Sequence, residues 1–206
     1  MLNMDPYVLL VVIGLLYVVV FGGLSFMRRE GLSLQFALEG LVLTAVLVGG
    51  SYLLNVQLHP ILFLIILYLV TMRSRLIADV ANVLAGRDNY NLAFRLYDLG
   101  LAWWPDGASR LIVLTNKGAA QLRRGQTEAA IATLEHVLSA STQQQLGLKY
   151  EAACRYNLGY AYEVNGEGAK ATQQYNEAVD AFPGSVYAKA AEAALKRRKK
   201  ALSPDD

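Results

Sequence analysis

The feature that most constrains this 206-residue chain is an uncharged run of 21 residues, Tyr7 to Met27. A predominantly apolar helix of that length crosses the hydrocarbon core of a bilayer. A cleaved signal peptide needs basic residues before its apolar run, whereas Arg28 and Arg29 follow this one. The run therefore predicts a permanent membrane helix with its N-terminus outside.

Charge divides the chain into a membrane domain, residues 1–72, and a soluble domain, residues 73–206. The first holds five charged side chains, and the second holds the other 31. The net charge of +2 does not indicate nucleic acid, and we expect no nucleic-acid partner. A single cysteine, Cys154, permits no internal disulfide, which fits a reducing compartment.

Three membrane helices are predicted, over about 7–27, 38–55 and 58–77. In the second, Ala45 and Gly49 form a small-xxx-small pair that lets another helix approach closely. The third contains only 13 uninterrupted apolar residues, so a re-entrant segment is the alternative.

Basic residues set the expected orientation. Arg28 and Arg29 follow the first span, and Arg73 and Arg75 follow the third. Because basic residues favour the inner side, we expect an integral protein of a plasma membrane of bacterial type, with its soluble domain cytoplasmic.

The soluble domain contains an internal repeat. Its clearest copy is "YNLGYAYEVNGEGAKATQQYNEAVDAFP", with Leu158, Gly159, Tyr162, Gly166, Ala171, Tyr175, Ala178 and Pro183 at the characteristic spacing. This segment resembles the tetratricopeptide repeat, a helical hairpin of about 34 residues. Two earlier copies depart from the pattern, for example by Lys117 at the usual leucine position and Thr142 at the usual proline position.

The resemblance covers roughly residues 74–202 and implies a short TPR-like α-solenoid of three helical hairpins with a C-terminal capping helix. With the three predicted N-terminal transmembrane helices before it, the expected fold is all-α. The repeats would cover about 74–107, 111–144 and 152–185, and the cap 186–202. The register of the first repeat also predicts that the third span continues into the solenoid, so that Pro60 to Ala85 forms one rod of about 39 Å.

In this family, partner proteins usually bind the concave groove lined by the first helix of each repeat. Transferred by register, the groove residues are Arg75, Asn82, Thr115, Leu122, Arg123, Tyr156, Tyr160 and Glu163. Some family members clamp a chaperone's carboxylate with a lysine that is replaced here by Ala78, so the sequence does not favour that use.

Membrane-interface anchors are expected at Arg28, Arg29, Arg73, Arg75, Trp103 and Trp104. For the two tryptophans, packing onto the second repeat is the alternative. The basic run Lys196 to Lys200 reads as a solvated helix end, with an acidic partner as the alternative.

No catalytic, cofactor-binding or metal-binding residues are predicted, and no cofactor. His59 is read as a loop residue, with pigment or metal ligation as the alternative, and Cys154 as an inert packing residue. We therefore expect a membrane-anchored protein–protein interaction module, an adaptor or assembly scaffold, rather than an enzyme. Its expected partners are proteins, bound through the groove and the transmembrane helices, and membrane lipid. The alternative is a permanent accessory subunit of a larger membrane complex.

Overall fold

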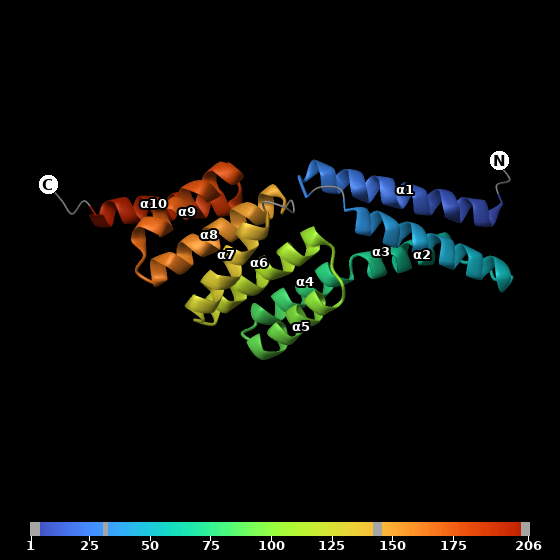
Figure 1. The fold of residues 1–206 in the computed structure, drawn as a ribbon, viewed down its shortest axis with the longest axis horizontal. Helices are drawn as coiled ribbons and strands as arrows, with labels where there is room; N and C mark the ends of the chain where they lie inside the picture. Colours follow the sequence, from blue (N-terminus) through green and yellow to red (C-terminus); the bar gives the residue numbers. More distant parts are fainter. Residues whose placement is uncertain (1–4, 31–32, 142–145, 203–206) are drawn as a thin grey trace.

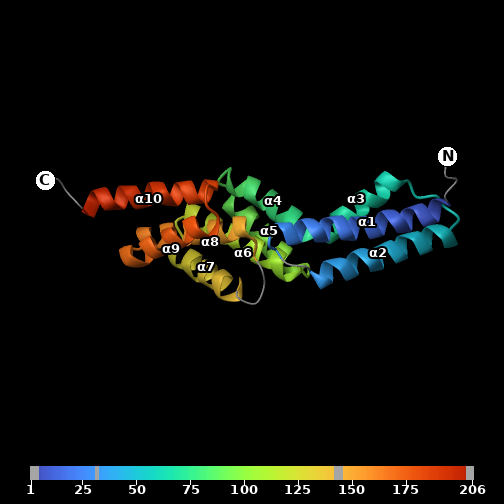
Figure 2. The same cartoon turned by 90° about the horizontal axis from the view of Figure 1, so that it is seen from above.

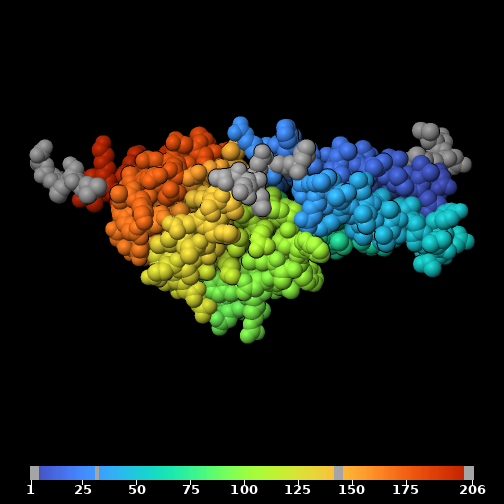
Figure 3. Space-filling view, viewed as in Figure 1, coloured from blue at the N-terminus to red at the C-terminus, as the bar shows by residue number. Residues whose placement is uncertain are grey.

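The computed structural model describes residues 5–30, 33–141 and 146–202, and all regular secondary structure in them is helical. The helices are α1 (Pro6–Met27), α2 (Leu34–Leu53), α3 (Pro60–Thr71), α4 (Arg73–Ala85), α5 (Tyr90–Ala102), α6 (Gly107–Arg123), α7 (Thr127–Ser141), α8 (Leu148–Val164), α9 (Gly168–Ala181) and α10 (Val186–Leu202). Helices α1–α3 form one end of an elongated molecule, and the later helices form a broader body (Figures 1 and 3). The all-helical prediction is confirmed for the described residues.

The first two helices are long and apolar enough to cross a membrane, at 22 and 20 residues. The α1 helix begins where the Asp5 carboxylate accepts a hydrogen bond from the backbone N–H of Tyr7 at 2.8 Å. The two helices approach closely because Gly14 of α1 faces Thr44 of α2. A Cβ at Gly14 would lie 2.4 Å from the Thr44 hydroxyl oxygen, so only glycine fits there.

The third apolar helix breaks at Met72, which corrects the prediction of one continuous rod over Pro60–Ala85. The bend between α3 and α4 is 74°, and Figure 2 shows the change of direction. At 12 residues, α3 rises about 18 Å, less than the roughly 30 Å of a bilayer core. The helix predicted over 58–77 is thus broken at Met72, and the described residues contain two candidate spans, or three if the bent pair counts as one.

Two side chains bond to backbone carbonyls at the bend. The Thr71 hydroxyl donates to the carbonyl oxygen of Leu67 at 2.8 Å, and the Arg73 guanidinium donates to that of Val70 at 2.8 Å. The same kind of hydroxyl bond also occurs inside the unbroken helix α6, from Thr115 to the carbonyl oxygen of Leu111, so it does not by itself break a helix. Nothing in the local sequence pattern marks this break, since neither glycine nor proline is present between residues 61 and 85.

After the break, helices pair into three hairpins, α4–α5, α6–α7 and α8–α9, and α10 packs against α8 and α9. Gly118 faces Leu134, and Gly159 faces Tyr175; a Cβ at either glycine would lie 2.8 Å from the facing side chain. Each second helix also buries an alanine completely at the matching position of its first half, and these are Ala93, Ala130 and Ala171. The same small–large packing thus recurs at equivalent positions along the chain.

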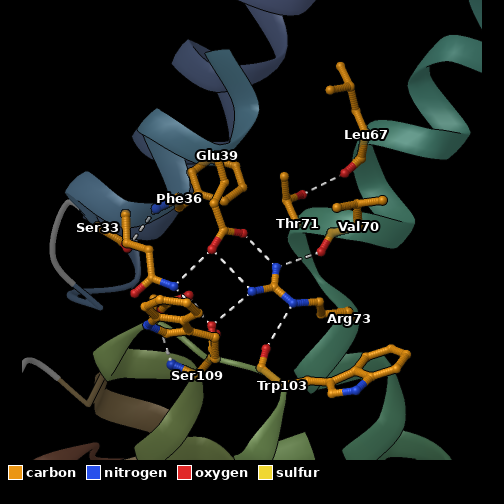
Figure 4. Close-up of polar contacts among 12 residues, drawn as sticks. Ser33, Phe36, Glu39, Leu67, Val70, Thr71, Arg73, Trp103 and Ser109 are labelled. Atoms are coloured by element: carbon orange, nitrogen blue, oxygen red, sulfur yellow. Dashed lines mark hydrogen bonds and ion pairs between the residues drawn. The ribbon is translucent and has the colours of Figure 1, made fainter. Parts of the chain in front are cut away.

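Two ion pairs join the apolar helices to the hairpins. Arg73, at the start of α4, binds Glu39 of α2 at 2.5 Å, and Arg75 binds Glu30, which follows α1, at 2.8 Å. The Arg73 guanidinium also donates to the carbonyl oxygens of Trp103 at 2.9 Å and Trp104 at 2.8 Å (Figure 4). We call the four charged residues of the two ion pairs, Glu30, Glu39, Arg73 and Arg75, the junction.

The junction fixes where the hairpins begin. Arg75 also donates to the hydroxyl of Ser109 in the first turn of α6, at 2.9 Å. Gly147, just before α8, packs so closely on Glu30 that a Cβ there would lie 2.8 Å from its side chain. The first helix of each hairpin therefore starts at the junction and runs away from it.

The Glu39–Arg73 ion pair should contribute to the free energy of unfolding, and the coupling between the two residues measures that contribution. In a double-mutant cycle of Glu39→Gln and Arg73→Gln, we expect a coupling free energy of about 2 kcal/mol, between the values typical of exposed and buried pairs. The measurement is the free energy of unfolding in detergent micelles.

The Asp98–Lys117 pair provides the matched control, because 62 % of the Asp98 side chain is exposed. Its coupling should stay below about 1 kcal/mol. Equal coupling energies in the two pairs would contradict a structural role for the junction.

Candidate functional site

The hairpins and α10 together form a groove of about 560 Å³ that crosses α4, α6, α8 and α10. Its lining consists of Asn82, Asn116, Ala119, Leu122, Arg123, Tyr156, Asn157, Tyr160 and Tyr187. The first helices of all three hairpins contribute because they start together at the junction and run in the same direction.

The structure places five of the eight predicted groove residues in this lining, namely Asn82, Leu122, Arg123, Tyr156 and Tyr160. The other three lie elsewhere. Arg75 is held in the junction. Thr115 is buried and donates to the carbonyl oxygen of Leu111. Glu163 accepts a hydrogen bond from the Tyr175 hydroxyl at 2.6 Å.

Four lining residues were absent from the prediction: Asn116, Ala119, Asn157 and Tyr187. The register contained the signal for three of them. Asn116 and Asn157 each precede the same repeat position, Lys117 and Leu158, and Ala119 takes the position that Tyr160 takes in the next repeat. The register contained no signal for Tyr187, because this residue comes from α10, outside the repeats.

Aromatic rings form one part of the groove. Tyr156 packs between Tyr175 and Tyr187, with ring centroids 5.9 and 6.1 Å away. Tyr160, one turn further along α8, is 46 % exposed. Rings that are partly buried and partly open provide rigid contact area for a bound polypeptide.

Amide groups form the other part. The Asn82 side-chain oxygen accepts a hydrogen bond from the Tyr97 hydroxyl at 2.6 Å, which leaves its amino group as a donor. Asn116 and Asn157 make no side-chain hydrogen bond to any described residue, and Arg123 is exposed without an ion pair to one. The groove therefore offers free donors and acceptors, and Arg123 is the only charged residue of its lining.

The residues predicted to anchor the chain in a membrane interface lie at or near the junction. Arg28 and Arg29 are exposed just after α1, and Trp103 and Trp104 are 52 % and 81 % exposed. Their backbone carbonyls bind Arg73, so the tryptophans lie at the level where the apolar helices end. A role as anchors in a membrane interface stays a prediction.

Ala45 and Gly49 do not pack against another helix among the described residues. Ala45 is exposed, and a Cβ at Gly49 would meet no atom within 4 Å. The close helix contact inside the chain is made by Gly14 and Thr44 instead. The small-residue pair on α2 faces outward.

The His59 side chain contacts the start of a helix. The His59 ring nitrogen Nδ1 accepts a hydrogen bond from the backbone N–H of Ile61 at 3.3 Å, which caps α3. No group of three His, Cys, Asp or Glu side chains that could hold a metal ion occurs in residues 5–30, 33–141 and 146–202.

Comparison with known proteins gives no relative: no protein-family model matches the chain, and no curated protein or solved structure matches it.

Burial should make the Cys154 thiol unreactive. Its side chain is fully buried, and desolvation raises the pKa of the thiol to about 12. Because the thiolate is the reactive form, alkylation at pH 8 should be roughly 10³-fold slower than in the unfolded chain, and should rise about tenfold per pH unit up to the pKa.

Mass spectrometry after iodoacetamide treatment, with and without denaturant, measures this difference. Ala129→Cys adds an exposed thiol on α7 as a control and should label rapidly in the folded protein. Rapid labelling of Cys154 in the folded protein would contradict the prediction that Cys154 is an inert packing residue.

Proposed function

We propose that the chain is a membrane-anchored docking protein with repeats of the tetratricopeptide type, and that its groove binds an extended segment of a partner protein. The observation that carries the proposal is the groove itself, which runs across four helices and presents unpaired amides beside partly exposed tyrosine rings.

The chemistry of the lining favours a polypeptide. A side-chain amide both donates and accepts hydrogen bonds, so amides at successive helices can pair with the backbone of an extended chain. The tyrosines offer contact area to its side chains. Because Arg123 is the only charged lining residue, the segment is neutral or acidic where it meets that residue.

The distribution of basic residues supports a cytoplasmic groove, since Arg28, Arg29, Arg73 and Arg75 all lie on the hairpin side of the apolar helices. The junction then holds the groove at a fixed angle to the anchor. In this proposal the membrane helices set where the partner is presented, and the groove selects it.

Truncating exposed groove residues should weaken partner binding without unfolding the protein. Tyr160→Ala and Arg123→Ala should each reduce recovery of the co-purifying partner by roughly tenfold, the effect of losing a central tyrosine or arginine contact. The measurement is quantitative mass spectrometry after gentle solubilisation of native membranes, alongside thermal unfolding.

Phe182→Ala is the matched control, because Phe182 is 39 % exposed and lies outside the groove lining. Tyr156 is a poorer target, since its ring packs on Tyr175 in the core. Unchanged recovery with both groove variants would rule out the groove as the docking surface.

A second candidate function, a permanent subunit of a larger membrane complex, is favoured by the outward-facing Ala45 and Gly49. If a partner helix packs there, Gly49→Leu should break the complex, whereas Val46→Leu on a neighbouring face of α2 should not. Native electrophoresis would separate the intact complex from the released chain. A complex insensitive to Gly49→Leu but lost with Tyr160→Ala would favour the docking function.

A further inference from the structure

A second cavity, of about 240 Å³, lies beside the junction, at the inner corner of the α3–α4 bend. Its walls come from α1, from α3 and α4 with Met72 between them, and from one residue each of α6 and α8. The lining consists of Phe21, Leu24, Ser25, Arg28, Tyr68, Met72, Arg75, Leu76, Asp79, Ile112 and Tyr150. It shares no lining residue with the groove.

The cavity lies where the apolar helices meet the polar body. Phe21, Leu24 and Tyr68 come from α1 and α3, whose neighbouring surfaces are largely exposed and apolar. Arg28 follows directly on the apolar run of α1, at the position that basic residues take at the end of a membrane helix. With α1 and α2 spanning a bilayer, the cavity would open at the depth of lipid headgroups.

Three charged side chains line this cavity, Arg28, Arg75 and Asp79. Arg75 is neutralised by Glu30 at 2.8 Å. Arg28 and Asp79 also line the cavity, both are exposed, and neither side chain forms a hydrogen bond or ion pair with another described residue. One free cation and one free carboxylate therefore remain, with the hydroxyls of Ser25, Tyr68 and Tyr150 in the same lining.

We propose that this cavity binds the headgroup of an amine-bearing membrane phospholipid of the phosphatidylethanolamine class. Arg28 binds the phosphate, Asp79 accepts hydrogen bonds from the ammonium group, and the acyl chains lie along the apolar surfaces of α1 and α3. The proposal is independent of the docking function, because it uses a different surface.

The headgroup chemistry follows from the two free charges. An anionic headgroup without an amine would leave the Asp79 carboxylate unpaired beside a phosphate, which is unfavourable. A choline headgroup carries a positive charge but no N–H donor, whereas an ammonium group donates three hydrogen bonds. An ethanolamine headgroup matches both charges and both hydrogen-bonding requirements.

Native mass spectrometry of the full chain tests the proposal. The protein is released from micelles supplemented with equal amounts of phosphatidylethanolamine, phosphatidylglycerol and phosphatidylcholine. We expect one retained lipid, with phosphatidylethanolamine preferred about fivefold, the effect of one well-placed charge at a membrane surface. Equal retention of the three lipids would overturn the proposal.

Two charge variants separate the roles of the headgroup contacts. Arg28→Gln should lower retention of every phospholipid about fivefold, and Asp79→Asn should abolish the preference for phosphatidylethanolamine over phosphatidylglycerol. Arg87→Gln and Asp180→Asn, which change exposed charges outside the cavity, should leave retention unchanged. If Arg28→Gln behaves like Arg87→Gln, the phosphate assignment is wrong.

Two further measurements test the cavity and the source of the ligand. Leu24→Trp keeps both charges but narrows the cavity, and it should reduce lipid retention as Arg28→Gln does; unchanged retention would place the lipid elsewhere. Glycerophosphoethanolamine, which has the headgroup but no acyl chains, should not displace the bound lipid at equal concentration. Displacement would assign the site to a soluble phosphodiester instead.

Discussion

The arrangement of this chain depends on two arginines at the start of α4 that pair with two carboxylates of the apolar half. Glu39 lies within α2, an otherwise uncharged helix, and such a carboxylate needs a partner when it is removed from water. Arg73 supplies that partner at 2.5 Å and also binds the carbonyls of Val70, Trp103 and Trp104. The guanidinium can do this because its donors diverge from one planar group. One side chain therefore contacts the end of α3 and the α5–α6 connection and ties both to α2.

The hairpin packing could be predicted from the sequence because it rests on local spacing. A residue without a side chain at Gly118 or Gly159 allows a leucine or tyrosine 16 residues later to pack directly on the helix backbone. That relation depends only on helix geometry and a short turn, so a single copy is enough to identify it. Five of the eight groove residues followed from the same register, which places one face of each first helix on the groove.

The break at Met72 could not be predicted in this way, because its cause is tertiary. Arg73 reaches acceptors that lie 34 residues before it and 30 and 31 residues after it in the chain. A local pattern contains no sign of such contacts, and an unbroken helix was the simplest reading of residues 60–85. The misplaced groove residues have a similar origin. Arg75 and Glu163 are turned from the groove by Glu30 and Tyr175, each supplied by another element.

The same three helices line the groove proposed for docking and the cavity proposed to bind a lipid, which we call the lipid cavity, so the two proposed sites are mechanically connected. Along α4, Asp79 lies at the lipid cavity and Asn82, one turn further, lies at the groove; in α6 the two residues are Ile112 and Asn116. In α8, Tyr150 and Tyr156 are separated by about 9 Å of helix rise. A helix is rigid over such distances, so the groove cannot change its angle to the apolar helices without displacing the walls of the lipid cavity. The bend at Met72 makes this arrangement possible, because a straight rod would leave no inner corner for the lipid cavity to occupy.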